Sequence, residues 1–181
     1  MNQVVAFLGA HLPACVRKRA LWALFRATAR AFERPVPPLA GLSADECLLR
    51  YAQFTQDRVA ELLLNGDHLV AVQERLYRNA YELGRACKRV SRTRTLKDAM
   101  ALSRVLYRLL DIEFQGEEGG DIVVSRCSFS CVYSGPVCQV MSAMDRGLLA
   151  GLSDGRQLVF TARITEGQAQ CRAHLSVERD T

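Results

Sequence analysis

The residues best suited to chemistry in this sequence are four of its seven cysteines, which lie between Ser125 and Leu175: Cys127, Cys131, Cys138 and Cys171. Thiols that a fold brings together can bind metal, exchange electrons or act as nucleophiles. Cys138 follows Gly135-Pro136, a pair typical of a helix start, and therefore falls in the first turn of an expected helix, Val137–Leu149. The partial positive charge of a helix N-terminus favours a thiolate at such a position.

Two further polar residues share one face of this expected helix with Cys138. Ser142 and Asp145 follow it at helical spacing, so all three side chains lie on one side. A thiolate, a hydroxyl and a carboxylate in line could serve as nucleophile, hydrogen-bond donor and base. The same pattern also fits a cysteine that only packs in the core, because free cysteine is among the most buried residue types. Both interpretations stay open at this point.

The cysteine spacing does not predict a metal site. Cys127 and Cys131 are separated by three residues, and no CxxC or HxxxH unit occurs anywhere in the chain. A structural zinc needs four ligands in a tetrahedral arrangement, usually supplied by such pairs. We therefore expect no metal and no other cofactor.

Two arginines in expected strands are candidate ligand-binding residues. Arg163 lies in the expected strand Gln157–Ile164, and Arg126 ends the expected strand Asp121–Arg126. If the face that carries them lines a cavity, each guanidinium could hold a substrate carboxylate through two parallel hydrogen bonds. If that face is open to solvent, each is an ordinary polar residue on a sheet surface. The alternation of the strands is compatible with both.

The elements that must position these residues are helical in the first part of the chain. Pro35, Pro37 and Pro38 predict an extended linker after the first helix. Apolar residues at helical spacing, together with capping signals, predict four helices: Ala14–Phe32, a helix from the capping box Ser43–Glu46 to about Leu64, one from the cap Asp67 to about Arg89, and one from the cap Thr95 to Leu110.

After this helical part the period changes to that of strands. Two strands, Ile112–Phe114 and Asp121–Arg126, flank a turn at Gly116–Gly120, and the Val137–Leu149 helix follows with Gly151 as its expected C-cap. A second hairpin is expected from Gln157–Ile164 and Gln170–Val177. The strand–strand–helix–strand–strand order predicts an α+β fold in which the N-terminal helices pack with a mainly antiparallel four-stranded sheet.

Length and composition favour one domain over residues 1–181, made of an N-terminal helix and proline-rich linker (1–42), a helical part (43–110) and a cysteine-rich α+β part (111–178). The apolar run Val4–Val16 is too short to cross a bilayer and lacks a preceding basic residue, so we expect no membrane association, no signal peptide and a cytoplasmic protein. The net charge of +5 is concentrated between Arg85 and Arg108. No nucleic-acid-binding motif accompanies it, and we expect no nucleic-acid partner.

The C-terminal part also carries a resemblance to a known family. The matching residues are Cys127, Phe129, Cys138, Asp145, Gly147, Gly151, Phe160, Arg163, Thr165, Gly167 and Cys171. Upstream, Tyr51-Ala-Gln-Phe54, Val105-Leu-Tyr-Arg108 and Asp111-Ile-Glu113 add to the pattern. This pattern resembles the L-2-amino-thiazoline-4-carboxylic acid hydrolase family.

The resemblance implies hydrolysis of a small cyclic substrate that carries a carboxylate. Cys138 would be the nucleophile, with Cys127 or Cys171 as substitutes, and Asp145 would be the base. The candidate substrate-binding residues are Arg163 and Thr165, which match the family pattern, and Ser142 and Arg126, which follow from the helix and strand spacing.

Two alternatives remain open. The stretch from Gly135 to Cys171 is also similar to the vinyl-reductase-type small-molecule-binding domain, which implies a non-catalytic, sensor-like protein. In zinc-binding members of that group a Glu and a Cys precede the last glycine, and Phe160–Ile164 contains neither. The second alternative is an interaction protein that forms a homodimer through its helical half.

Overall fold

The computed structural model describes residues 13–66 and 68–176. The expected helix cap at Asp67 and most of the apolar run Val4–Val16 lie outside the described residues. Within the described part of the chain, no helix is both long and apolar enough to cross a membrane.

The four predicted N-terminal helices are confirmed. Ser43 and Glu46 form the predicted capping box, in which the Ser43 hydroxyl accepts from the Glu46 amide and the Glu46 carboxylate accepts from the Ser43 amide. Thr95 and Asp98 form a second reciprocal cap. The helices are α2 (Ala14–Ala31), α3 (Ala44–Asn65), α4 (Leu69–Ser91) and α5 (Leu96–Leu109).

The predicted α+β class and the four-stranded sheet are also confirmed. The strands are β1 (Ile112–Gly116), β2 (Asp121–Cys127), β3 (Gln157–Ala162) and β4 (Cys171–Ser176), joined in the order β1-β2-β4-β3 with antiparallel neighbours throughout. The strand β3 ends before the predicted Ile164, because Arg163 already caps a short 3-10 helix, η2 (Ile164–Glu166). A second 3-10 helix, η1 (Ser128–Cys131), follows β2.

The helix α6 (Gly135–Leu152) connects the two strand pairs and begins at the predicted Gly-Pro signal. The prediction that Gly151 is its C-cap is wrong, because the helix continues through Gly151 and its C-cap is Ser153. Gly151 instead faces α4, and a Cβ atom there would collide with the Tyr81 carbonyl oxygen.

Glycines of α4 and α6 form a close contact between these two helices. A Cβ atom on Gly147 would lie well inside contact distance of the Tyr77 carbonyl oxygen, and one on Gly84 would collide with the Leu148 carbonyl. Three positions without side chains, Gly84 on α4 and Gly147 and Gly151 on α6, therefore let the two backbones touch.

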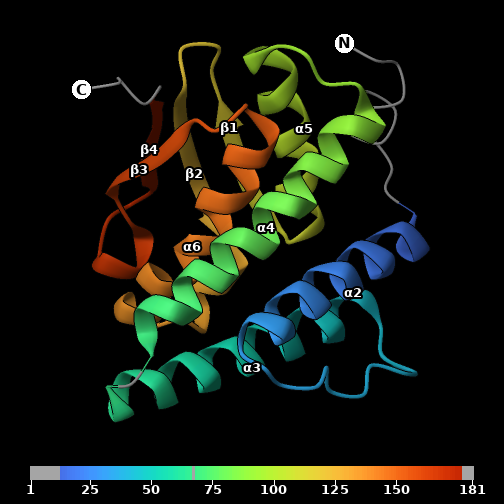
Figure 1. The fold of residues 1–181 in the computed structure, drawn as a ribbon, viewed down its shortest axis with the longest axis vertical. Coiled ribbons are helices and arrows are strands. Elements are labelled where there is room, and N and C mark those ends of the chain that lie inside the picture. The colour runs from blue at the N-terminus through green and yellow to red at the C-terminus, as the bar shows by residue number, and fades with distance from the viewer. Residues whose placement is uncertain (1–12, 67, 177–181) are drawn as a thin grey trace.

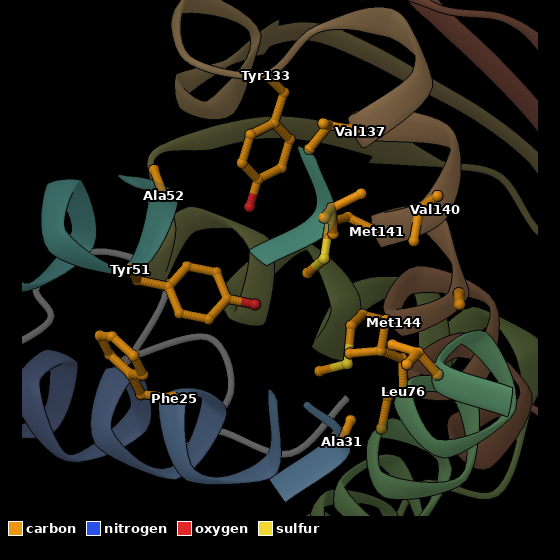
Figure 2. Packing of buried hydrophobic residues seen from close by; sticks show 14 residues of the cluster. Phe25, Ala31, Tyr51, Ala52, Leu76, Tyr133, Val137, Val140, Met141 and Met144 are labelled. Atoms are coloured by element: carbon orange, nitrogen blue, oxygen red, sulfur yellow. The ribbon is translucent and has the colours of Figure 1, made fainter. Parts of the chain in front are cut away.

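This contact holds the layers of the molecule together. Figure 1 shows α4 crossing α6, with the sheet on one side of the pair and α2 and α3 on the other. The inner face of the sheet packs on α5 and α6 through a cluster that includes Phe114, Leu149 and Leu158. A second cluster joins α6 to the other helices, and in Figure 2 Met141 and Met144 of α6 face Tyr51 and Phe25.

Gly147→Ala tests the dependence on this close approach. We expect the free energy of unfolding to fall by about 1–3 kcal/mol, because the added methyl group must push the two helices apart. Urea denaturation measures the change. Gly119→Ala is the matched control, since nothing lies within 4 Å of a Cβ atom there. It should alter stability by no more than about 0.5 kcal/mol. Equal effects of the two substitutions would contradict the role of the contact.

Candidate functional site

A cavity of about 130 Å³ lies between α6, the inner face of the sheet and the helical part of the protein. Its wall contains six of the eight candidate site residues: Cys127, Cys138, Ser142, Asp145, Arg163 and Cys171. Residues that are far apart in the sequence are thus brought to one place.

Each of these side chains reaches the cavity from a defined position in the fold. Cys138 and Asp145 project from one face of α6, as the helical spacing predicts. Cys127 ends β2 and Cys171 begins β4, and Cys171 pairs with Val124 of β2, which brings the two ends together. Arg163 follows the register shift near the end of β3.

Aromatic rings form much of the remaining wall. Phe129 and Tyr133 stack with ring centroids 5.2 Å apart, and Tyr107 stacks on Phe114 at 4.7 Å. These rings were not among the predicted site residues, because aromatic residues at helical or strand spacing are typical of any core. The resemblance was the signal available for two of them, since Phe129 and Tyr107 lie in its matching stretches.

The hydroxyl groups of the two tyrosines on the helical side are already paired. Tyr51 and Thr28 share a hydrogen bond of 3.1 Å, and Tyr133 and Thr55 share one of 2.6 Å. All four side chains are buried. This side of the cavity therefore presents mainly apolar ring surface to a ligand.

Asp145 is the one acidic residue in the cavity wall formed by the described residues. Burial raises the pKa of its carboxyl group to about 6. The Tyr107 hydrogen bond and the charges of Arg146 and Arg163 lower this pKa, but their effect is smaller than that of burial. The Tyr107 hydroxyl donates to Asp145 Oδ1 at 2.8 Å. A carboxyl group with this pKa changes its charge close to neutral pH and is suited to proton transfer.

The cysteines of the cavity are held as thiols. Burial raises the pKa of Cys127 to about 12, and it also raises the pKa values of Cys138 and Cys171. The predicted advantage of Cys138 at a helix N-terminus is outweighed by this burial, so the thiolate is disfavoured at neutral pH.

Arg163 brings a positive charge to the cavity wall. Its guanidinium stacks over the Phe160 ring at 4.4 Å, and its Nη1 is 3.7 Å from Glu166 Oε1. Its Nε is buried and has no hydrogen-bond partner within residues 13–66 and 68–176. Because an unpaired buried donor is costly, this N–H group is a candidate contact for a ligand.

Thr165 lies beside the cavity rather than in its wall. Its Oγ1 is buried without a well-formed hydrogen bond in the described part of the chain. The hydroxyl nevertheless lies near the Cys138 thiol, whose pKa it lowers against the larger effect of burial.

Two further residues from the sequence analysis, Arg126 and Cys131, lie outside the cavity wall. Arg126 is exposed and pairs with Glu113 at 2.9 Å and with Asp111 at 3.1 Å. Cys131 is exposed at the end of η1. The four cysteines of the segment therefore do not meet at one point, and no three His, Cys, Asp or Glu residues of the described chain are arranged to hold a metal ion.

No family model, curated protein or solved structure matches this chain. Membership in the L-2-amino-thiazoline-4-carboxylic acid hydrolase family therefore stays a prediction, as does homodimer formation.

Asp145→Asn tests the electrostatic cost of the buried carboxyl group. Between pH 3.8 and about pH 6, the folded protein keeps the Asp145 proton while the unfolded chain has lost it, because the pKa is raised in the folded state. The free energy of unfolding therefore falls as the pH rises through this interval. The shift corresponds to a loss of about 2 kcal/mol between pH 4 and pH 7. Urea denaturation at the two pH values should show this loss in the wild type and a smaller one in the variant. If the variant lost as much stability as the wild type between pH 4 and pH 7, Asp145 would not be the group responsible for the loss.

Proposed function

We propose that this protein binds a small, mostly apolar molecule that carries a carboxylate, inside the cavity between α6 and the sheet. The observation that carries the proposal is the composition of the wall. Aromatic and aliphatic side chains surround the space, and the charged groups among its described residues are Asp145 and Arg163. Small-molecule sites are commonly built this way, with an apolar wall and few polar groups that fix orientation.

The size of the cavity limits the ligand. Its volume is about 130 Å³, and a protein cavity of about 150 Å³ accommodates benzene. The apolar part of the ligand is therefore limited to about one small planar ring, with its carboxylate at the wall beside Arg163. Phe129, Tyr133 and Met141 are among the apolar residues that would contact the ring.

Arg163 is the proposed carboxylate anchor. Its Nε is free to donate, and its guanidinium is held in place by Phe160 and Glu166. A guanidinium fixed in this way loses little freedom when it binds, and charge-assisted hydrogen bonds are stronger than neutral ones.

Binding of benzoate and of 2-amino-thiazoline-4-carboxylate by calorimetry tests this function. We expect Arg163→Gln to weaken binding at least tenfold, because a buried carboxylate would lose its charged partner, an effect of about 1.5–3 kcal/mol. Arg126→Gln is the matched control, since Arg126 is exposed and pairs with Asp111 and Glu113. Its affinity should match that of the wild type. Equal affinities for the Arg163 variant and the control would contradict the anchor.

Hydrolysis of the bound molecule is a second candidate function, favoured by Asp145. A carboxyl group with a pKa of about 6 inside a ligand cavity is suited to accept a proton from water. On this proposal, water attacks the ring carbon between nitrogen and sulfur, and Asp145 takes one proton from the water and passes it to the ring nitrogen. The bond from this carbon to sulfur then breaks as the carbonyl group forms, and the remaining hydroxyl proton goes to the departing sulfur. The raised pKa of Cys138 favours this route over attack by a thiolate, with Cys127 and Cys171 disfavoured in the same way.

Turnover of 2-amino-thiazoline-4-carboxylate by three variants tests the hydrolytic candidate. We expect Asp145→Asn to lower kcat by about 10²-fold or more, the usual contribution of a general base. Cys138→Ser should retain most of the turnover, as should the control Cys15→Ser, which alters an exposed thiol on α2. Loss of turnover in Cys138→Ser alone would favour covalent catalysis instead. Absence of turnover in the wild type would leave binding as the function.

A further inference from the structure

The cavity contains one fixed positive charge and one negative charge that can be neutralised. Arg163 and Asp145 both line it and interact electrostatically, and no other Lys, Arg, Asp or Glu of the described chain is in its wall. With Asp145 ionised, the charges of the cavity wall thus sum to about zero. A ligand carboxylate would place a second negative charge beside the same guanidinium.

We propose that a carboxylate ligand enters this cavity together with one proton from the solvent, which is taken up by the Asp145 carboxylate. The inference rests on the proposed binding function and not on the hydrolytic candidate, which needs an ionised Asp145. It adds regulation to the binding function: a carboxylate and one proton enter together, so the net charge of the cavity does not change. Two buried carboxylates that share one cation repel each other strongly, since water does not screen them there. Protonation of one of them removes this repulsion and leaves the cavity neutral.

Asp145 is the group that takes up the proton because its neighbours are held uncharged. Tyr51 from α3, Tyr107 from α5 and Tyr133 after η1 all face it, and burial raises the pKa of each phenol. The thiols that face it have raised pKa values as well: Cys127 from β2, Cys138 from α6 and Cys171 from β4.

The other elements add no competing proton acceptor. In the cavity wall, α2 contributes Leu24, and α4 contributes Ala80 and Leu83. The cations that act on Asp145 are Arg146 of α6 and Arg163. Glu166, 3.7 Å from Arg163, is outside the wall. Asp154, an exposed acid that pairs with Lys88 and is also outside the wall, provides a control position.

Protonated Asp145 would also be a better partner for the ligand. Ionised, it can only accept hydrogen bonds, and one of its oxygens already accepts from Tyr107. Protonated, it gains an O–H donor that can reach an acceptor atom of the ligand. The ligand would then be held by Arg163 on one side and by a neutral carboxyl group on the other.

The pH dependence of benzoate affinity, measured by calorimetry from pH 5.5 to 8.5, tests the proposal, with the neutral analogue benzamide beside it. Uptake of one proton predicts that the Kd for benzoate rises about tenfold per pH unit above pH 6. Benzamide should bind with little pH dependence. Calorimetry in buffers of different ionisation enthalpy should give an uptake approaching one proton per benzoate near pH 7.

Three variants assign the proton. Asp145→Asn should bind benzoate with a Kd that no longer rises with pH. Asp154→Asn, which alters an exposed acid outside the wall, should keep the slope of the wild type. Tyr107→Phe provides a second test that retains the acid. Loss of its hydrogen bond to Asp145 should move the onset of the rise in Kd to higher pH, because that bond favours the ionised form.

The outcomes separate the two proposals. If benzoate binds the wild type but its Kd is the same at pH 6 and pH 8, proton uptake is wrong and the binding function stands. A slope that persists in Asp145→Asn also overturns the inference. If neither benzoate nor 2-amino-thiazoline-4-carboxylate binds at any pH, the proposed function fails, and the inference fails with it.

Discussion

The close contact between α4 and α6 is the constraint on which the rest of this structure depends. Gly84, Gly147 and Gly151 bring the two backbones into direct contact, and this places α6 between the sheet and the other helices. One face of α6 is therefore occupied by α4, while another carries Cys138 and Asp145 toward the cavity. A wider helix pair would shift these side chains relative to the strand ends that complete the wall.

The cavity combines two surfaces of different character. The helical side offers rings whose hydroxyl groups are already satisfied by Thr28 and Thr55. The wall also carries Arg163, whose Nε is buried and unpaired within the described residues. A ligand with an apolar ring and one anionic group matches these two surfaces. Its ring would contact the aromatic side chains, and its anionic group would exchange hydrogen bonds to water for hydrogen bonds to Arg163.

Burial determines the chemistry of the site more than residue type does. It keeps the thiol of Cys138 protonated although the residue lies near a helix N-terminus, and it brings the carboxyl pKa of Asp145 to about 6. Three cysteines line the site, but the group in it that changes its charge near neutral pH is the carboxyl group of Asp145. This contrast favours binding or water-activating chemistry over nucleophilic attack by sulfur.

The sequence by itself determined the elements: the capping boxes at Ser43 and Thr95, the Gly135-Pro136 helix start and the alternating strands predicted the α+β fold, because these signals act over a few residues. It also placed Cys138 and Asp145 on one helix face.

Only the tertiary structure decided that Arg163 reaches the cavity while Arg126 pairs with Asp111 and Glu113 on the surface, since both arginines fit the same strand pattern. It also decided that Gly151 is a helix contact and not a cap. These outcomes depend on which segments pack together, and a local pattern contains no information about its distant neighbours.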